Sequence, residues 1–475
     1  MRFVDRKREL EHLERYFRRS RQKLFPVAIM GLRRVGKTRL VFEFSKGRNF
    51  LYFYVNPNKR SSDLLREFFD ILRLKLSIPR YVRVDDWSSF VEVLFEFASN
   101  WIIIFDEFQY FTRIAPEVFG EFQKFIDMYS NKPMLLIFVG SMIGMMKDIF
   151  ENKARPLYDR VKAKIRVKPL SFQYILEILN DIGSWSFEDK LKLYFLFGGY
   201  PKYYVSLDDL SLGGSHIDII IRELFIDENA PYRNEGKILL GNSERKVFYS
   251  IIEAISIGKR KLSDIAAYTG IKETQLPQYM DDLVFALEAV IREVPVDAGP
   301  DTRRSLYYIA IPTMEFWFRY LHRYWSLVEL GLTEQLVKMI MDDINNFFAT
   351  QFEFFAREFI VELSRRGKLS FEIWKIGRWW RKKHEIDIVA IDQKNKAYLA
   401  LACRWGRLTL KKALTEIERT KQHATYMKMT NKKAYYGIIA KEIQKKETLR
   451  ELGYLAWDLK DIEQTYTKQK TGKNN

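Results

Sequence analysis

The chain has 475 residues, too many for one hydrophobic core, and about three or four domains are expected. Hydrophobic residues make up 47% and aromatic residues 15% of it, which excludes a disordered chain. The single cysteine, Cys403, excludes an intramolecular disulfide framework and a cysteine zinc cluster. No apolar run approaches the roughly 20 residues that cross a bilayer, and Met1 to Leu10 contains no apolar signal segment, so a cytoplasmic protein is expected.

The positive charge is concentrated near the C-terminus. The net charge is +18, and residues 365–475 hold 27 Lys and Arg against 12 Asp and Glu, a net +15 that leaves only +3 for the rest. A basic surface can simply confer solubility. Its concentration in one segment favours a polyanionic partner instead, with nucleic acid the best candidate.

Residues 1–170 alternate between helical and strand patterns, which is typical of an α/β fold with a parallel sheet. The expected strands are Phe25–Met30, Phe50–Val55, Trp101–Phe105 and Met134–Val139. The expected helices are Arg6–Arg19, Thr38–Ser45, Ser61–Leu76, Trp87–Ser99 and Glu117–Met128. After Pro169 the strand patterns fade, and residues 171–242 are predicted to form a helical lid.

Residues 243–311 show a different pattern. Three helices are expected over Ser243–Ser256, Leu262–Thr269 and Gln275–Leu287, followed by strands over Glu288–Pro295 and Ser305–Ile311. Three helices and a hairpin indicate a winged helix. Such a module binds DNA in some proteins and serves as a protein-interaction or lid module in others, and both interpretations stay open. The triplet Lys259, Arg260 and Lys261 offers the better phosphate contacts here.

The remaining chain is predicted to form a helical connector over residues 312–344, an α/β domain over 345–466 and a polar tail over 467–475. The last domain should begin with a helix over Phe347–Arg365. Its expected strands are Phe371–Ile376, Ile386–Ile391, Ala397–Cys403 and Ala434–Ile439, with a helix over Leu410–Tyr426.

A phosphate-binding loop stands between the first strand and the following helix. Its residues are Gly31, Leu32, Arg33, Arg34, Val35, Gly36, Lys37 and Thr38, followed by Arg39. The glycines let backbone N–H groups surround phosphates, the helix presents its positive N-terminal end, and Lys37 reaches the β and γ phosphates. The Thr38 hydroxyl is expected to bind Mg²⁺. The sequence therefore predicts an ATP site.

Two acids, Asp106 and Glu107, follow the buried strand Trp101–Phe105. Acids at the carboxyl end of such a strand face the crevice in which parallel sheets bind ligands. We expect Asp106 to hold Mg²⁺ through water and Glu107 to orient the attacking water, which favours hydrolysis over binding alone. Two acids can also cap a helix, but their spacing of about 70 residues after the loop favours the catalytic interpretation.

Further side chains are candidates for the same site. Ser141 follows the strand Met134–Val139. It either contacts the γ phosphate or the attacking water, or it is an ordinary turn residue. Arg160 is a candidate charge-stabilising arginine, supplied within the chain or by a neighbour. Arg33 and Arg34 are interpreted as structural or ADP-contacting.

With these motifs, the chain resembles a family of archaeal ATPases that is sometimes grouped with the signalling NTPases called STAND. The resemblance rests on the segments Phe3–Leu10, Gly31–Thr38, Phe105–Glu107, Gly140–Ser141, Leu157–Arg160, Lys168–Phe172, Gly198–Pro201, Lys375–Trp380 and Glu385–Val389. It implies that Asp5 and Arg6 pack beside the adenine, and that Gly199–Pro201 lies on a nucleotide-sensing lid. Asp159 departs from the usual glycine, which weakens the assignment of Arg160.

The C-terminal domain resembles a PD-(D/E)xK nuclease, a restriction-endonuclease-like fold. Asp387 occupies the first acidic position, but Ala402 and Arg404 stand where an acid and a lysine are expected. Alanine cannot bind a metal, and an arginine stays protonated and cannot act as a base. Glu353 or Glu358 on the preceding helix remains a possible ligand. We therefore expect a degenerate nuclease-like domain that does not cut, unless a relocated acid restores the site.

Two functions remain. One is an ATPase that acts on or is regulated by DNA, with backbone contacts expected from Arg365, Arg366, Arg378, Arg381, Lys382, Lys383, Lys411 and Lys412. The other is a STAND-like switch, in which ATP binding exposes a surface for protein partners or drives homo-oligomerisation. Trp379 and Trp380 are interpreted as base-stacking or as core residues, and the basic C-terminal segment favours the first function.

Overall fold

The computed structural model describes residues 2–241, 246–299, 302, 304–392, 394, 396–427, 429 and 432–467. The chain divides into two compact units. The first contains residues up to Ile178 together with Gly199–Ser206 and Asp281–Glu288, and the second contains the rest. Short pieces of the expected lid and winged helix thus belong to the first unit. The expected tail lies, apart from Thr467, outside the described residues.

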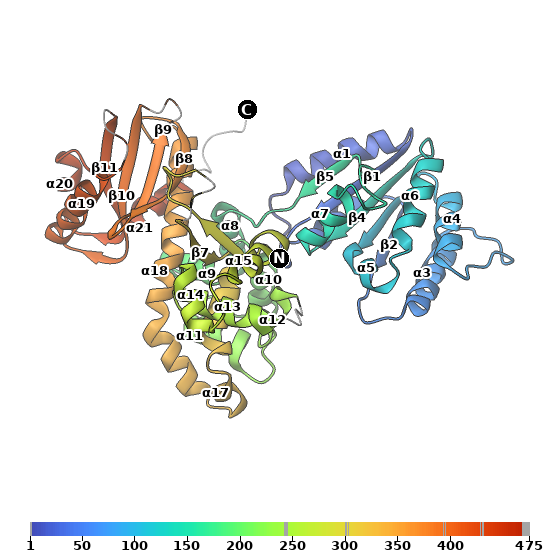
Figure 1. Ribbon diagram of the computed structural model, residues 1–475, viewed down its shortest axis with the longest axis horizontal. Coiled ribbons are helices and arrows are strands. Elements are labelled where there is room, and N and C mark those ends of the chain that lie inside the picture. Colours follow the sequence, from blue (N-terminus) through green and yellow to red (C-terminus); the bar gives the residue numbers. More distant parts are fainter. Residues whose placement is uncertain are drawn as a thin grey trace. The chain divides into compact units, whose positions relative to one another are not determined.

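The first unit is built on a five-stranded parallel sheet with the strand order β2-β3-β4-β1-β5 (Figure 1). Its strands are β1 (Leu24–Met30), β2 (Phe50–Tyr54), β3 (Ile102–Asp106), β4 (Met134–Gly140) and β5 (Ala163–Arg166). The first four were predicted within two residues. The edge strand β5 was missed because its four residues alternate between small, charged and apolar types and give no buried-strand pattern.

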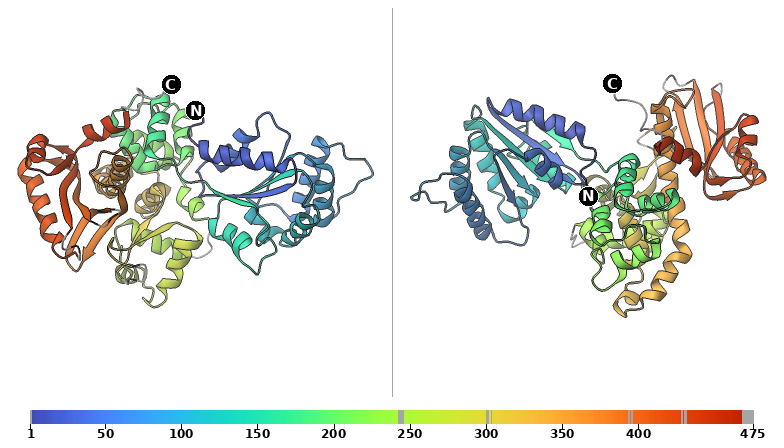
Figure 2. Two further views of the ribbon diagram at one scale, coloured as in Figure 1. Left: turned by 90° about the horizontal axis from the view of Figure 1, so that it is seen from above. Right: turned by 180° about the vertical axis from the view of Figure 1, so that it is seen from behind.

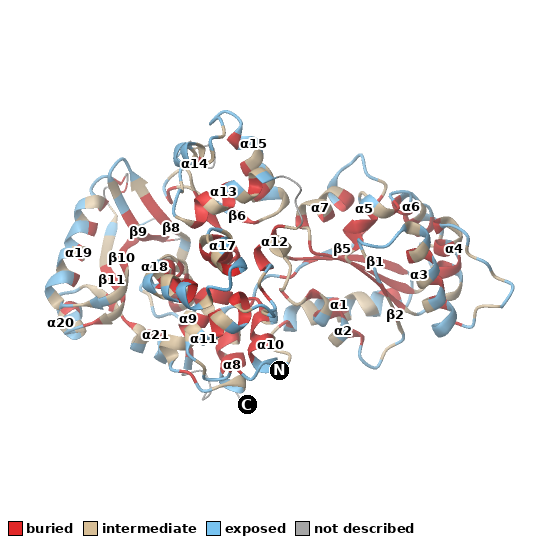
Figure 3. Cartoon of the chain, turned by 90° about the horizontal axis from the view of Figure 1, so that it is seen from below, coloured by how far each residue is buried: buried red, intermediate tan, exposed pale blue. Residues whose placement is uncertain are grey.

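Helices cover both faces of this sheet, as parallel strands require. They are α1 (Lys7–Ser20), α2 (Lys37–Ser45), α3 (Ser61–Lys75), α4 (Trp87–Phe97), α5 (Phe111–Ile114), α6 (Val118–Met128) and α7 (Ile143–Glu151). Helices α1 and α2 lie on one face, and α3, α4, α6 and α7 lie on the other (Figure 3). The three central strands, β1, β3 and β4, are buried along their whole length.

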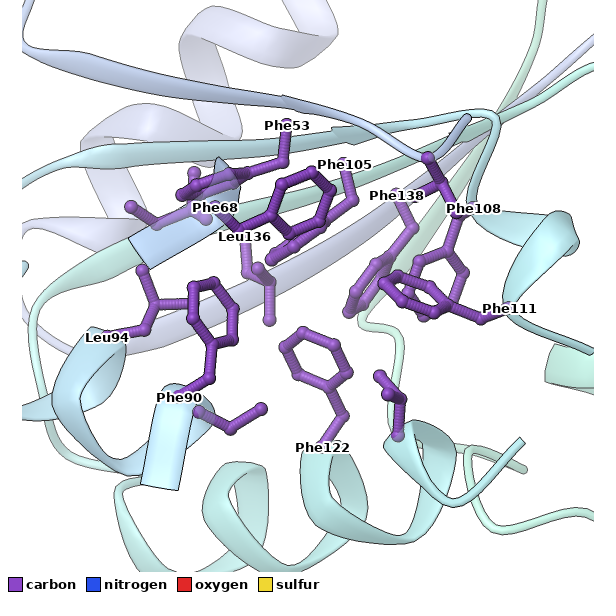
Figure 4. Packing of buried hydrophobic residues seen from close by; sticks show 14 of the residues in the cluster. Phe53, Phe68, Phe90, Leu94, Phe105, Phe108, Phe111, Phe122, Leu136 and Phe138 are labelled. Carbon is purple, nitrogen blue, oxygen red and sulfur yellow. The ribbon is translucent and has the colours of Figure 1, made fainter. Parts of the chain in front are cut away.

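A cluster of phenylalanines supports the carboxyl end of β3 (Figure 4). The Phe105 ring lies 4.9 Å from Phe53, 5.1 Å from Phe122 and 6.3 Å from Phe138, measured between ring centroids, and all four are fully buried. Each such aromatic pair contributes about 0.5–1.5 kcal/mol beyond area burial. Because Phe105 precedes Asp106 directly, this packing fixes the position of the acidic pair.

A helical region follows the first sheet. They are α8 (Phe172–Ile182), α9 (Phe187–Phe197), α10 (Pro201–Asp209), α11 (Ile217–Ile221), α12 (Glu235–Leu240), α13 (Lys246–Ser256), α14 (Leu262–Thr269) and α15 (Leu276–Asp281). A π-helical turn, Asp282–Ala286, continues α15. Strands β6 (Val290–Glu293) and β7 (Leu306–Ile309) form an antiparallel hairpin, so the elements expected for a winged helix are present.

A long helix introduces the C-terminal part of the second unit. After α16 (Pro312–Phe316), a π-helical turn (Trp317–His322) and α17 (Trp325–Glu329), helix α18 runs unbroken over Thr333–Arg365. The expected boundary between residues 344 and 345 therefore falls inside one helix of 33 residues. Buried side chains, among them Ile340, Ile344 and Phe347, continue across it.

A second five-stranded sheet, mixed and ordered β12-β11-β10-β9-β8, completes this unit. Its elements are β8 (Ile373–Arg381), β9 (His384–Asp392), β10 (Ala397–Leu408), α19 (Leu410–Ala424), β11 (Lys433–Ile443), α20 (Lys446–Glu451), β12 (Leu455–Trp457) and α21 (Leu459–Thr467). β8, β9 and β10 are antiparallel neighbours, whereas β10, β11 and β12 are parallel. Figure 2 shows α18 and α19 on opposite sides of the sheet.

Candidate nucleotide-binding site

The phosphate loop joins β1 directly to α2. Gly36 has φ 91°, a left-handed conformation that favours glycine, and it immediately precedes the first residue of α2. Gly31 is required for a different reason, because a Cβ there would lie 2.5 Å from the carbonyl oxygen of Val167. The two glycines of the motif thus allow a close backbone approach and a turn into the helix N-terminus, the arrangement that binds phosphates.

Lys37 is held inside the loop and is only 6% exposed. Its Nζ donates hydrogen bonds to the carbonyl oxygens of Gly31 at 2.9 Å and Leu32 at 3.0 Å. Burial lowers the pKa of Lys37 to about 8, although the charges of Glu107 and Asp106 act in the opposite direction. The site therefore contains a buried ammonium group whose charge an anionic ligand would stabilise.

Asp106 lies beside Thr38, the other residue that the sequence analysis expects to hold Mg²⁺. The Thr38 hydroxyl donates to Oδ2 of Asp106 at 2.6 Å, and the Tyr52 hydroxyl donates to the same oxygen at 2.9 Å. Burial raises the pKa of Asp106, and the hydrogen bonds from Thr38 and Tyr52 partly oppose that rise. A hydroxyl and a carboxylate at this distance supply the hard oxygen ligands that Mg²⁺ prefers, so the residues fit the ion.

Glu107 and Ser141 also converge, from the ends of neighbouring strands. The Ser141 hydroxyl donates to Oε2 of Glu107 at 2.7 Å, and the side-chain amide of Gln109 donates to the same oxygen. Glu107 has φ 58°, a conformation that costs energy for a residue with a Cβ. Its carboxylate is thus fixed in direction by two hydrogen bonds and by an unusual backbone.

Tyr52 and Gln109 are polar neighbours of the acids that the sequence analysis missed. Gln109 is fully buried, and it lies two residues after Glu107. Tyr52 lies on β2, which pairs with β3 and places Tyr52 beside Ile104, two residues before Asp106. Tyr52 could have been predicted to lie near the acids, because it is a polar residue in the second half of the expected strand Phe50–Val55. Nothing in the sequence indicates which way the Gln109 side chain points.

The remaining residues predicted for the nucleotide site are Asp5 and Arg6, before the first helix, and the arginines Arg34 and Arg39. Nη2 of Arg6 donates to the carbonyl oxygen of Val35 at 2.9 Å, and Arg6 is buried. Asp5 accepts a hydrogen bond from Tyr174 on α8. Arg34 has φ 69° within the loop, whereas Arg39 lies exposed on α2. Arg6 thus lies against the phosphate loop, and its neighbour Asp5 bonds to α8.

The within-chain role expected for Arg160 is wrong. Arg160 forms an ion pair with Asp127 at 3.1 Å and lies just before β5. Two residues further on, the backbone N–H of Lys162 donates to the carbonyl oxygen of Pro26, which places this segment near the start of β1. The phosphate loop follows the opposite end of that strand, which is about 20 Å long at 3.3 Å per residue. Arg160 therefore lies at the amino edge of the sheet and cannot reach a phosphate on its own loop.

In the C-terminal domain, Arg404, which stands at the lysine position of the nuclease motif, is paired with Asp387. Oδ2 of Asp387 accepts from Arg404 at 2.7 Å and from the backbone N–H of Cys403 at 2.8 Å. The same guanidinium donates to Glu416 at 2.6 Å, and Ala402 is buried. Asp387, the acid that matches the first position of the nuclease motif, is thus paired with a permanent cation.

The helix-borne acids are paired as well. Glu353 forms an ion pair with Arg378, which also binds Glu385. Glu358 accepts from the Tyr194 hydroxyl at 3.0 Å. Among the described residues, no three Asp, Glu, His or Cys side chains form a group that could hold a metal ion.

Two of the residues expected to contact nucleic acid have structural roles. Arg378 is 4% exposed and enclosed by its acidic partners, so it cannot reach a phosphate. Arg366 is half-buried and binds Glu362 at 2.7 Å. Trp379 is fully buried, which confirms the core interpretation for that residue. The exposed members of the set are Arg365, Arg381, Lys382, Lys383, Lys411 and Lys412.

The fold and the loop define a P-loop ATPase core, and comparison with known proteins specifies its type. Residues 3–207 match the family described as "ATPase domain predominantly from Archaea". Residues 317–417 match a second family, described as "Archaea bacterial proteins of unknown function". The chain thus contains an ATPase domain of this archaeal type together with a region of unknown function.

The chain is similar over most of its length to an uncharacterised protein of Methanocaldococcus jannaschii. The two are 29% identical over 449 residues, which cover 94% of this chain and 97% of that protein. A solved structure, the Walker-type ATPase of Pyrococcus abyssi, is 19% identical and shares the fold with a TM-score of 0.51, over 67% of this chain and 96% of that one.

The ORC2 protein of Aeropyrum pernix, solved in ADPNP–ADP complexes, is 16% identical, with a TM-score of 0.46 over 72% of this chain and 96% of that one.

In the part of the chain that the structure describes, no helix is both long and apolar enough to span a membrane.

Proposed function

We propose that this protein binds and hydrolyses ATP with Mg²⁺ and that nucleic acid is its partner. One observation carries the proposal: Lys37, the Thr38–Asp106 pair and the Glu107–Ser141 pair meet at the carboxyl edge of one sheet. A buried ammonium, a pair of metal-binding oxygens and an oriented carboxylate are the parts that phosphoryl transfer to water requires. The match to an ATPase family supports this assignment.

Each residue has a distinct role in this proposal. Lys37 and the backbone N–H groups of the loop bind the β and γ phosphates, and Arg6 holds the loop through Val35. Thr38 and Asp106 hold Mg²⁺, which neutralises phosphate charge when it is bound. Glu107 orients the attacking water and accepts its proton, while Ser141 fixes the direction of the Glu107 carboxylate.

The nucleic-acid part of the proposal rests on charge. Residues 365–475 carry a net +15, and the exposed lysines Lys382, Lys383, Lys411 and Lys412 have side chains available for phosphate contacts. The C-terminal domain has the element order that the sequence predicts, a helix, three strands, a helix and a further strand, and this order supports the nuclease-like interpretation. Because Arg404 neutralises Asp387, we propose that this domain binds DNA without cutting it.

A nucleotide-dependent switch is the second candidate, and one contact favours it. A Cβ at Gly36 would lie 4.0 Å from the ring of Pro201, the first residue of α10. The turn that leads into α10 therefore lies directly against the phosphate loop. Gly199 in the same turn approaches the backbone of Leu170 so closely that no side chain fits. A nucleotide that moves the loop would thus displace the turn, and through it α10.

The experiment is a measurement of ATP turnover with and without single- and double-stranded DNA, with Glu107→Gln as the matched inactive variant. Turnover that DNA stimulates and Glu107→Gln abolishes supports the first proposal. Slow turnover that DNA does not change, with tightly retained ADP and nucleotide-controlled self-association, supports the switch. Absence of magnesium-dependent ATP binding contradicts both, and cleavage of plasmid DNA that Asp387→Ala abolishes contradicts the degenerate nuclease-like domain.

A further inference from the structure

Arg33, inside the phosphate loop, reaches towards the acidic pair. Its Nη2 donates to the Tyr110 hydroxyl at 2.5 Å. Tyr110 lies in the short turn that begins after Glu107, three residues along from it. The guanidinium of Arg33 therefore extends from the end of β1 to the turn behind β3 and lies between the phosphate loop and the Glu107 turn.

The electrostatics of the neighbouring groups agree with this position. The charge of Arg33 helps to lower the pKa of Lys37, and Glu107 and Asp106 act on the same ammonium in the opposite direction. Tyr54, at the end of β2, has a pKa raised by burial and then by Glu107, Tyr110 and Asp106, while Arg33 lowers it. Arg33, Lys37 and Glu107 thus form one charge cluster.

The site also lacks the arginine expected from elsewhere in the chain, because Arg160 lies at the opposite edge of the sheet. Phosphoryl transfer places negative charge on the equatorial γ oxygens and on the leaving oxygen, and a nearby guanidinium stabilises it. A cation that spans the loop and the Glu107 turn lies where that charge develops. The Lys37 ammonium bonds to carbonyl oxygens of the loop itself, whereas the Arg33 guanidinium bonds to the turn that follows Glu107.

We propose that Arg33 is a catalytic residue of hydrolysis, supplied from within the phosphate loop, which contacts the γ-phosphoryl oxygens. This inference rests on the proposed ATPase function. The oxygen of water bonds to the γ phosphorus, and the bond from that phosphorus to the β–γ bridging oxygen breaks. The electron pair of that bond leaves with ADP, and the proton of water passes to the Glu107 carboxylate. Arg33 exchanges its hydrogen bond to Tyr110 for bonds to the transferring group.

Three variants of the full-length protein test the proposal: Arg33→Ala, Arg33→Lys and Arg113→Ala. Arg113 is exposed on α5 and serves as a matched control for the loss of one positive charge near the site. Arg33→Ala should lower kcat by about a thousandfold, the scale of a charge-stabilising arginine, and change the Kd for ATP less than about fivefold. Arg33→Lys keeps the charge without the planar fork and should recover only part of the rate. Arg113→Ala should turn over ATP at the wild-type rate.

A second readout uses ADP with aluminium fluoride, which imitates the transferring phosphoryl group. The wild type should bind this pair much more tightly than ADP alone, and Arg33→Ala should lose that preference. Arg33→Ala with kcat within threefold of wild type overturns the inference while leaving the proposed ATPase intact. A loss of ATP affinity as large as the loss of kcat/KM also overturns it, because it shows ground-state binding instead. A wild type that does not hydrolyse ATP overturns the proposed function itself.

Discussion

The buried ammonium of Lys37 makes ATP affinity depend on pH in a calculable way. With a pKa of about 8, Lys37 loses its proton as the pH rises through that value. Only the protonated form pairs with a triphosphate, so binding is strongest below pH 8 and weakens above it. The apparent Kd should therefore be about tenfold higher at pH 9 than at pH 7, equivalent to about 1.4 kcal/mol.

Calorimetric titration measures this effect directly. Phosphate groups are fully ionised above pH 8, so proton uptake there reports on the protein. Uptake on ATP binding should be about 0.5 proton at pH 8 and about 0.9 at pH 9, obtained from buffers of different ionisation enthalpy. Lys37→Arg is the matched control, because a guanidinium does not titrate in this range. Equal proton uptake at both pH values, or equal pH dependence in the Arg variant, would refute the argument.

Three further predictions concern Glu107, Arg404 and the exposed pair Lys411 and Lys412. Glu107→Gln should lower kcat at least about a hundredfold with little change in ATP affinity, and phosphate-release assays with calorimetry check both values. Arg404→Met leaves Asp387 without its cation, and it should destabilise the C-terminal domain by about 1–3 kcal/mol because the pair is partly exposed. The control Arg407→Ala, at an exposed ion pair, should cost less than about 1 kcal/mol. Chemical denaturation in which Arg407→Ala costs more stability than Arg404→Met would contradict the pairing. Lys411→Glu combined with Lys412→Glu should weaken DNA binding and reduce the salt dependence of the affinity by about two ions, and an unchanged slope would exclude these contacts.

The phosphate loop could be predicted from the sequence because its function is local. Gly31, Gly36 and Lys37 act through their own backbone and the helix that follows, so eight consecutive residues specify the geometry. The position of Asp106 was also predictable, because a continuous apolar run ends directly before it. Ser141 could be predicted as a candidate for the same site because parallel neighbouring strands end at the same edge of the sheet.

The residues that sequence reasoning misplaced act over longer distances. The partners of Arg160 and Arg378 lie far away in the sequence, and only the fold shows that Asp127 holds the first and Glu353 the second. Tyr52 and Gln109 were missed for the same reason, since their hydrogen bonds to the acids depend on strand pairing and on the turn after β3. The degenerate position at Arg404 was recognised, but its partner Glu416 lies on a helix and had no sequence signal.

The proposed nucleotide site depends most directly on the pairing of Thr38 with Asp106 beside Lys37. The decisive measurement is calorimetry of ATP binding, with and without Mg²⁺, to the wild type, Lys37→Ala and Asp106→Asn. One ATP should bind per chain to the wild type, Lys37→Ala should abolish binding, and Asp106→Asn should remove its dependence on Mg²⁺. Wild-type ATP binding that neither substitution changes would contradict the proposed site.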